Sequence, residues 1–449
     1  MVRTGVPAAR TPRPRAVLLV ANDANPYSRA LRLARSLDAD GYDVEIAAVA
    51  GDAPAHETDG RIVIRRYAPS GRWARWSEAR DDPARSGGAA RARARPERFG
   101  PRIVDTLRRG PSALFDLARK IVFWPLAVRG WWHTLRRELP PADVYHAFGI
   151  LTIGVALDLG RQARAAGRRG VVVYDVIDVI LDSNNYTMVP GVVLGWYKWR
   201  ERRWVRRADA IVTVNEPIAE HLTRIWRLPA PPTVLLNCQP RWAAPTERPD
   251  HIRAATGIPA ERRIVLFLGR LGRERCLDEA AAAVLELDDA ALVLIGFGPW
   301  ADQLRERDRD PRFVGRHFTL PPVHPDEVAA WTSSADVSII AVPANSLNQR
   351  LSTPNKFWES LTAGTPVVVG SELSVMRAIV EADGLGAIAD LYDLARGLRE
   401  VLEQPADDLR AMQDHCLEVT RTRYNWEIAV APYLSMLRPL AGGLGGADR

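Results

Sequence analysis

The chain has 449 residues, so we expect two or three domains, each large enough to bury its own core. Its three cysteines lie far apart and match neither a metal-ligand spacing nor a disulfide scaffold, which favours a reduced compartment. The net charge of +7 mainly affects solubility and the electrostatic attraction of charged ligands. No apolar run reaches about 18 residues, which excludes a spanning helix and predicts a cytoplasmic protein.

The first elements in chain order predict a parallel βαβ unit. Residues 1–15 are basic and interrupted by prolines, so we expect a loose tail there. An apolar strand at 16–20 is followed by a polar turn, a helical pattern through Leu37 and a second strand at 44–49. Parallel units of this kind gather their ligands at the carboxyl ends of the strands.

The N-terminal α/β domain is expected to span residues 16–237, with an insert at 68–135. Between Tyr67 and Arg102 the chain is mostly arginine, alanine, glycine and proline, a composition that cannot form a core and predicts a loop. Beyond the insert the apolar runs alternate again with helical segments. Further strands of this domain are expected at 143–147, 171–174, 211–214 and 234–236.

A second α/β domain is expected at 238–423, followed at the end of the chain by a tail at 441–449. Prolines cluster between 229 and 249, where the periodicity lapses, as is typical of an interdomain connection. The fold class is therefore α/β, with two Rossmann-like doubly wound sheets that face a central cleft. The strands of the second sheet are expected at 264–268, 291–295, 313–314, 337–340 and 367–369.

The segment Ser352–Gly364 predicts a helix that binds phosphate. Thr353 suits the N-cap, Pro354 the first helical position and Gly364 the residue after the end. Lys356 then falls in the first turn, where a cation is unfavourable unless an anion is bound. Only 3 of the 61 basic residues are lysines, Lys120, Lys198 and Lys356, so a lysine here is less expected by chance than an arginine.

Glu359 lies three residues after Lys356, on roughly the same face of this helix. Its carboxylate could accept hydrogen bonds from ribose hydroxyls, as acidic residues do in dinucleotide-binding folds. The alternative is an ordinary Lys–Glu surface pair. At the end of the strand 264–268, Gly269 and Arg270 lie at the expected ligand edge, and Arg275 follows before the next helix. The guanidinium fork suits phosphate oxygens.

These residues resemble the retaining GT-B glycosyltransferases of the family-4 type, the glycosyl transferases group 1. In the second domain the matching segments are 268–271, 294–299, 335–339, 355–359 and 363–368. In the first domain they are 142–147, 173–175 and 208–214. The segment 424–427 resembles the start of the terminal helix, so the resemblance implies that 424–440 crosses back to the first domain.

The resemblance implies a role for individual residues. Arg270, Arg275 and Lys356 would neutralise the diphosphate leaving group, Glu359 would hold the ribose, and His146 would contact the donor sugar. No metal and no cofactor would be needed beside the nucleotide-sugar substrate. The donor-binding set is Gly269, Gly296, Gly298, Ser352, Thr353, Pro354, Asn355 and Glu359, and the acceptor-side set is Asn25, Asp175 and Asp178.

Three positions depart from the family pattern. Leu351 stands where the family usually has a second glutamate. The resemblance implies that this glutamate contacts the donor sugar, so the replacement removes a carboxylate from that contact. Arg275-Cys276 replaces a lysine–glycine pair, so the charge is kept but its geometry changes. Ile177-Asp178 replaces a histidine–glutamate pair on the acceptor side. We expect backbone N–H groups of the loop 344–350 to compensate for the missing carboxylate.

Aromatic and basic residues mix at 102–137 and again at 196–204. One interpretation is peripheral contact with an anionic membrane at the inner face of the plasma membrane, with a lipid-linked acceptor. The alternative is that these helices pack against the first sheet. No nucleic-acid motif accompanies the basic residues, so a nucleic-acid partner is not expected.

The sequence thus predicts a retaining, metal-independent transferase that moves a hexose from a nucleotide-diphosphate donor to a glycan or lipid-linked acceptor. One alternative is a catalytically silent partner of another glycosyltransferase, because Leu351 replaces a carboxylate. Another is a nucleotide-sugar epimerase of similar fold, which would need acid/base carboxylates such as Asp175 and Asp178.

Overall fold

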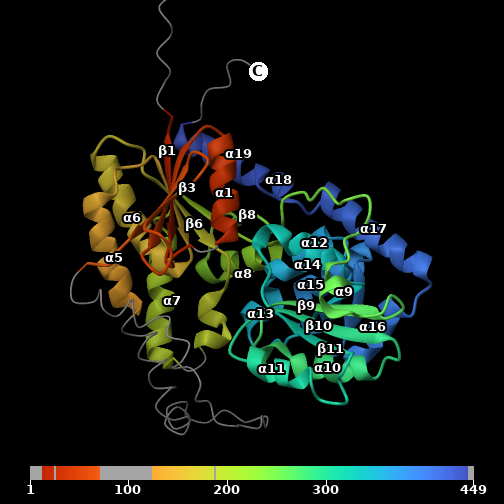
Figure 1. Cartoon of the computed structure of the whole chain (residues 1–449). Coiled ribbons are helices and arrows are strands. Elements are labelled where there is room, and N and C mark those ends of the chain that lie inside the picture. The colour runs from red at the N-terminus through yellow and green to blue at the C-terminus, as the bar shows by residue number, and fades with distance from the viewer. Residues whose placement is uncertain (1–12, 25–26, 71–123, 187–188, 443–449) are drawn as a thin grey trace, which may run out of the picture.

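A computed structural model describes residues 13–24, 27–70, 124–186 and 189–442. They form two α/β domains that lie side by side, each built on its own sheet (Figure 1). The predicted fold class is confirmed. Asn25 and residues 102–123 lie outside the described residues, as do residues 1–12 and 443–449 of the predicted tails 1–15 and 441–449. Arg15 and Ala441, which were assigned to those tails, belong to a strand and a helix.

The N-terminal sheet has eight strands in the order β3-β4-β2-β1-β5-β6-β7-β8. All neighbours are parallel except β3 and β4. The chain leaves β1 in one direction and returns on the other side with β5, so the order reverses there, as in doubly wound folds. The strands are β1 (Arg15–Val20), β2 (Asp43–Val49), β3 (His56–Asp59), β4 (Ile62–Tyr67), β5 (Val144–Phe148), β6 (Val171–Val176), β7 (Ala210–Thr213) and β8 (Thr233–Val234).

Helices cover both faces of this sheet, because a parallel sheet is apolar on both sides. One face packs against α1 (Ser28–Ala39) and the end of the chain. The other face packs against the remaining helices of the domain. These are α5 (Trp124–Glu138), α6 (Ile150–Ala165), α7 (Gly191–Val205) and α8 (Glu216–Trp226), with the short helices η4 (Ile180–Asp182) and η5 (Asn184–Tyr186) before α7.

One side of the described part of the aromatic and basic segment 102–137 packs inside the protein. Trp131 and Leu135 of α5 are fully buried against the first sheet, and the indole of Trp131 donates to the carbonyl of Ala48 at 3.0 Å. For α5, the structure therefore favours packing against the sheet. In the second aromatic segment Trp196 and Trp199 are exposed.

The C-terminal sheet has six parallel strands in the order β11-β10-β9-β12-β13-β14. The strands are β9 (Arg263–Arg270), β10 (Ala290–Phe297), β11 (His317–Leu320), β12 (Val337–Ile340), β13 (Val367–Gly370) and β14 (Gly386–Ala389). The helices are α9 (His251–Thr256), α10 (Leu277–Leu285), α11 (Ala301–Arg307), α12 (Val328–Ser333), α13 (Leu347–Leu351), α14 (Asn355–Thr362), α15 (Ser374–Asp383), α16 (Leu394–Leu402) and α17 (Ala406–Thr422), with the short helices η6 (Arg273–Arg275) and η7 (Pro325–Glu327).

The predicted strand at 313–314 is wrong. Phe313 and Val314 lie in a turn in which both backbone N–H groups donate to the carbonyl of Asp310, at 2.8 and 3.1 Å. The side chain of Phe313 packs into the core of the domain, which explains the apolar pattern at this position. The edge strand β11 follows it. Strands β3, β4, β11 and β14 were not predicted.

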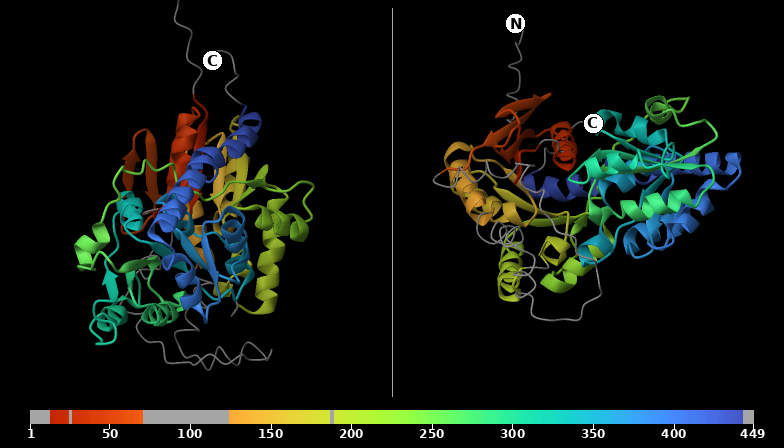
Figure 2. Two further views of the ribbon diagram at one scale, coloured as in Figure 1. Left: turned by 90° about the vertical axis from the view of Figure 1, so that its right-hand side faces the viewer. Right: turned by 60° about the horizontal axis from the view of Figure 1, so that its bottom comes forward.

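The end of the chain returns to the N-terminal domain. After α17, which packs on the C-terminal domain, α18 (Trp426–Ala429) and α19 (Ala431–Ala441) lie next to α1 on the first sheet (Figure 2). Asn425 caps α18 through its side chain, and the indole of Trp426 donates to Ser36 Oγ at 2.8 Å. The N-terminal domain is thus completed by a segment from the far end of the sequence.

A buried ion pair joins three elements of the N-terminal domain. Arg29 of α1 donates from Nε and Nη2 to the two oxygens of Asp175 on β6, at 2.9 and 3.1 Å. His146 of β5 lies 3.2 Å from Asp175 Oδ2 through Nε2, and 3.0 Å from the hydroxyl of Tyr433 on α19 through Nδ1. Burial raises the pKa of Asp175, but Arg29 and His146 outweigh it and hold that pKa below its usual value.

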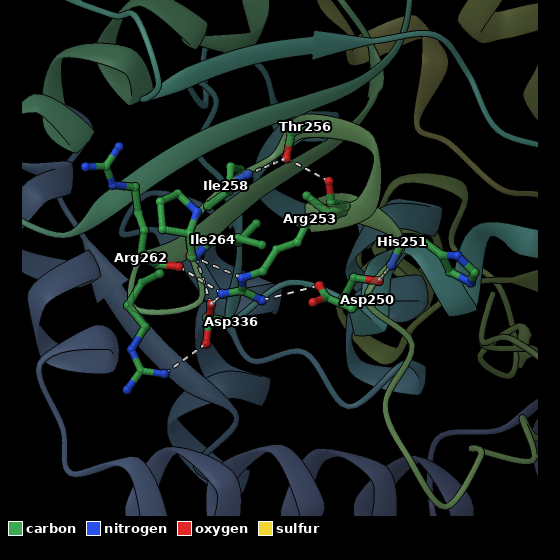
Figure 3. Close-up of polar contacts among 12 residues, drawn as sticks. Asp250, His251, Arg253, Thr256, Ile258, Arg262, Ile264 and Asp336 are labelled. Carbon is green, nitrogen blue, oxygen red and sulfur yellow. Dashed lines mark hydrogen bonds and ion pairs between the residues drawn. The ribbon is translucent and has the colours of Figure 1, made fainter.

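A second network stabilises the C-terminal sheet at the amino ends of its strands, the edge opposite the carboxyl ends (Figure 3). Arg253 of α9 donates to the carbonyl of Arg262 at 2.8 Å and ion-pairs with Asp250 and Asp336 at 3.5 and 3.7 Å. Asp336 also accepts from the backbone N–H of Ile264 at 2.8 Å. Because ligands of doubly wound sheets bind at the carboxyl edge, we assign this cluster a structural role.

We predict that Asp175→Asn lowers the free energy of unfolding by about 3–5 kcal/mol, because it leaves the Arg29 guanidinium buried without its counter-charge. The matched control is Asp59→Asn, which removes the exposed ion pair with Arg35 and should cost less than about 1 kcal/mol. Urea unfolding of both variants checks the difference. Equal losses would contradict the assignment.

Candidate functional site

Glycines bring the carboxyl ends of β9 and β10 into close contact. Gly269 and Gly296 are paired in the sheet, and a Cβ on Gly296 would lie 1.8 Å from the carbonyl oxygen of Gly269. A Cβ on Gly298 would lie 2.1 Å from the carbonyl oxygen of Leu271. These two predicted donor-site glycines are therefore required by backbone packing at the strand ends. Gly269 itself has φ 125° and open space beside it.

The helix α14 begins one residue later than predicted. Pro354, expected at the first helical position, occupies the N-cap with extended ψ 159°, and Thr353 makes no capping hydrogen bond. Within the described residues the buried Thr353 hydroxyl has no partner. The predicted cap is thus wrong, and Asn355 and Lys356 are the first two helical residues. Their N–H groups belong to the first turn, which has no intrahelical partners.

Lys356 and Arg275 form a pair of neighbouring cations at this helix end. Lys356 Nζ lies 3.9 Å from the ring centroid of Phe267 on β9. Burial and then the charge of Arg275 lower the pKa of Lys356 to about 7, although Glu359 opposes them. Lys356 has no ion pair within the described part of the chain. An anion placed here would relieve this unfavourable charge.

Arg270 and Arg275 both lie near Glu274 of the turn that follows β9. Each guanidinium Nε is 3.7 Å from Glu274 Oε1, and neither makes a closer acidic contact among the described residues. Cys276, where the family usually has glycine, adopts φ 53°, a left-handed conformation that glycine accommodates without strain. Burial raises the pKa of its thiol to about 12, so the thiol stays protonated.

Glu359 lies where the two domains meet. Burial raises the pKa of its carboxyl to about 6, while Arg32 of α1 and Lys356 oppose that shift. No ion pair within 4 Å joins Glu359 to Lys356 among the described residues, so the ordinary surface pair that was the alternative is not formed. Glu359 therefore keeps its hydrogen-bonding capacity for another group.

Arg32 belongs to an interdomain network that the sequence did not indicate. Its guanidinium donates to the side-chain oxygens of Asn237 and Gln239, both at 2.7 Å. Asn237 in turn donates to Asn355 Oδ1 at 2.7 Å, and Asn355 Nδ2 lies 3.4 Å from Ser28 Oγ. The side chain of Asn355, a predicted donor-binding residue, thus connects the domains.

The structure does not bring His146 and Asp175 to the cleft. Both are fully buried and satisfied in the ion-pair network, and burial lowers the pKa of His146 although Asp175 opposes the shift. Both ring nitrogens of His146 already have partners, Tyr433 and Asp175, and its contact with a donor sugar stays a prediction. The carboxylate of Asp175 is likewise held by Arg29 and His146, and its role on the acceptor side stays a prediction.

The short helix α13 was missed, and it contacts the N-terminal domain. Ser346 caps it by accepting from Gln349 N–H, and the Ser-x-x-Gln pattern was its signal in the sequence. Asn348 accepts from Val179 N–H at 2.7 Å and donates to Asp178 at 3.1 Å. Asp178 therefore lies at the domain interface, where burial raises the pKa of its carboxyl.

Leu351, in place of the family's glutamate, ends α13. Its side chain packs against the apolar cluster of the N-terminal domain, and its carbonyl accepts from Asn215 Nδ2 at 2.8 Å. The next residue, Ser352, donates its backbone N–H to the carbonyl of Asn348 at 2.9 Å. At this position an apolar contact between the domains thus replaces a carboxylate.

The described residues contain neither a cluster of metal ligands nor a membrane-spanning helix. Across the described ranges, no group of three or more His, Cys, Asp or Glu side chains is arranged to hold a metal ion. None of the helices in those ranges is long and apolar enough to cross a membrane. All three cysteines are free and buried.

The two doubly wound α/β domains and the return of the terminal helices to the first domain define the GT-B fold. Residues 27–238 match the family described as glycosyl transferase 4-like domain, and residues 249–415 match the family described as glycosyl transferases group 1. The chain belongs to the group 1 glycosyl transferases.

Individual relatives are distant. A D-inositol 3-phosphate glycosyltransferase of Mycolicibacterium smegmatis is 29% identical over 38% of this chain and 39% of its own length. An alpha-monoglucosyldiacylglycerol synthase of Streptococcus pneumoniae is 23% identical over 49% of each chain. The matches therefore span about half or less of the length of these curated relatives.

Solved structures share the fold over nearly the whole chain. Sucrose-phosphate synthase from Thermosynechococcus elongatus superposes with a TM-score of 0.65 at 16% identity, covering 95% of this chain and 99% of its own. HepE of Anabaena, solved in complex with UDP, has a TM-score of 0.64 at 12% identity and covers 94% and 99%. At such identities the likeness shows the fold.

We predict that UDP binding at pH 8 takes up a proton at Lys356. With a pKa of about 7 this amine is mostly neutral at pH 8, and a bound diphosphate raises its pKa, so binding protonates it. Calorimetry in buffers of different ionisation enthalpy measures the uptake. Lys356→Met should abolish it, whereas Arg410→Met, an exposed cation on α17, should not. Equal uptake by both variants would contradict the assignment.

Proposed function

We propose that this protein transfers a sugar from a nucleoside-diphosphate donor to a glycan or lipid-linked acceptor. The observation that carries the proposal is the pair of neighbouring cations, Lys356 and Arg275, at the open N-terminus of α14. This pair lies at the carboxyl edge of the C-terminal sheet, where doubly wound folds bind nucleotides. Membership of the group 1 glycosyl transferases agrees with it.

Negative charge grows on the diphosphate as the bond to the sugar breaks. Fixed cations aimed at that charge stabilise the transition state more than the ground state, and this difference accelerates the reaction. Arg275 and Lys356 would stabilise the diphosphate in this way. Arg270 would lie at the rim of the site, because the Arg270 guanidinium is more exposed than that of Arg275. The N–H groups at the start of α14 add partial positive charge.

The nucleoside would lie toward the domain interface. Glu359 has unused hydrogen-bonding capacity there and would accept from the ribose hydroxyls at neutral pH, above its pKa of about 6. Gly269, with open space beside it, allows the donor to approach the backbone of β9. The three cationic side chains provide the charge compensation that a metal ion would supply, so we propose metal-independent transfer.

Retention of anomeric configuration is part of the proposal and rests on the family resemblance. The acceptor class rests on the relatives, one named for an inositol phosphate and another for a glucosyldiacylglycerol. We propose a cytoplasmic protein, with peripheral contact to the inner face of the plasma membrane through the aromatic and basic residues of α7, where Trp196 and Trp199 are exposed.

Turnover tests the proposal directly. Purified protein is incubated with UDP- and GDP-sugars and a membrane extract, with and without EDTA, and nucleotide release is measured. We expect release with at least one donor, unaffected by EDTA, and Lys356→Ala should lower kcat/KM by about 100-fold or more because it removes a charge that acts in the transition state. Arg410→Ala serves as the control. The product's anomeric configuration by NMR tests retention.

A second candidate is a catalytically silent partner of another glycosyltransferase. The replacement of a carboxylate by Leu351, whose side chain packs between the domains, favours it. The two candidates differ in one outcome: a silent partner binds UDP or GDP and releases no nucleotide from any donor sugar. Such a result would reject the enzyme proposal and leave the nucleotide site in place.

A further inference from the structure

A cavity of about 430 Å³ lies in the N-terminal domain between η4, α7 and α8. Its wall is largely apolar, with contributions from Ile180, Leu181, Trp199, Ile225, Trp226 and Leu347. Leu347 comes from α13 of the other domain, and Asp178, which accepts from Asn348, also lines the cavity. The cavity thus borders the interface between the two domains.

Two hydrogen-bond donors of the side chains that form this wall have no acceptor among the described residues. The Nδ1 atom of His221 lies 3.3 Å from the guanidinium of Arg224, which can only donate, so the neutral ring carries its proton on Nε2. This Nε2 and the Nε of Arg202 are both buried, and neither has a partner in the part of the chain that the structure describes. Buried donors without acceptors are unfavourable, so their presence in a cavity wall points to a ligand that accepts hydrogen bonds.

One ion pair forms among the charged side chains that line the cavity, and the other lining charges have no ion pair among the described residues. Lys198 is held by Asp182, and Asp178 accepts from Asn348. Glu201 accepts from the hydroxyl of Tyr174 at 2.7 Å, and burial raises the pKa of Glu201 to about 7. Arg202 is the lining cation that has no ion pair among the described residues, whereas burial raises the pKa of the unpaired carboxyls of Asp178 and Glu201 and so weakens their negative charge. The group that fits beside Arg202 is an anion.

We propose that this cavity binds the acceptor, and that the acceptor is an amphiphile with a phosphate group. The phosphate oxygens accept hydrogen bonds from Arg202 and His221, and the apolar part lies on Trp199, Ile225 and Leu347. The hydroxyl-bearing end then points past Asp178 toward the cleft. This inference rests on the proposed function, since it assigns the acceptor of the same reaction.

The charge requirement is tested by calorimetry with octyl phosphate as the probe. Arg202→Gln should weaken its binding about tenfold or more, because it removes a charged hydrogen-bond donor. Arg206→Gln changes an exposed arginine at the end of the same helix that does not line the cavity, and should leave the affinity unchanged. No binding to the unaltered protein, or equal affinity for both variants, would overturn the proposal.

The apolar requirement has its own matched pair of variants. Trp199 lines the cavity and Trp196 does not, yet both are exposed on α7 and each stacks with an arginine, Arg203 and Arg200 respectively. Trp199→Ala should weaken octyl phosphate binding several-fold and Trp196→Ala should not. If glucose 6-phosphate or inorganic phosphate binds as tightly as octyl phosphate, the ligand is a soluble phosphate and the amphiphile is rejected.

UDP titrations separate this inference from the proposed function. All four variants should bind UDP with unchanged affinity, because the cavity lies in the other domain from α14. Intact UDP binding without octyl phosphate binding would reject the acceptor site alone. Loss of UDP binding by the unaltered protein would reject the proposed function.

Discussion

The buried ion pair between Arg29 and Asp175 fixes α1, and the arrangement of the two domains depends on α1. The pair extends through His146 to Tyr433, so it also anchors the terminal helix α19 that returns from the C-terminal domain. One turn further along α1, Arg32 reaches the interdomain connection at Asn237 and Gln239. A charge buried at the centre of one domain therefore sets the position of the other.

The same arrangement explains the electrostatics of the candidate site. Docking of α1 against the connection brings Arg32 near Glu359, while Arg275 lies near Lys356 on the other side. Burial weakens the charged form of both Lys356 and Glu359, so each gains more from a ligand that restores its charge or its hydrogen bonds. Such preorganised groups act without rearrangement when charge develops.

The departures from the family pattern have physical explanations in the structure. Cys276 takes the left-handed conformation that a glycine would adopt, and Arg275 keeps the positive charge beside Lys356. At position 351 the leucine side chain makes an apolar contact with the N-terminal domain, where the family's glutamate would present a carboxylate. The cap of α13, with Asn348 bonded to Val179 and Asp178, then holds that contact in place.

The sequence by itself determined the two doubly wound sheets and the cationic start of α14, because apolar periodicity and capping residues act locally. It misplaced the first residue of that helix, since Thr353 and Pro354 both suited its start. It also missed β3, β4, β11 and β14, of which β3, β11 and β14 are four-residue edge strands. Only the tertiary structure decided that His146 and Asp175 are buried and that Glu359 lies beside Arg32. Those outcomes depend on contacts between residues hundreds of positions apart, such as His146 with Tyr433, which no local pattern encodes.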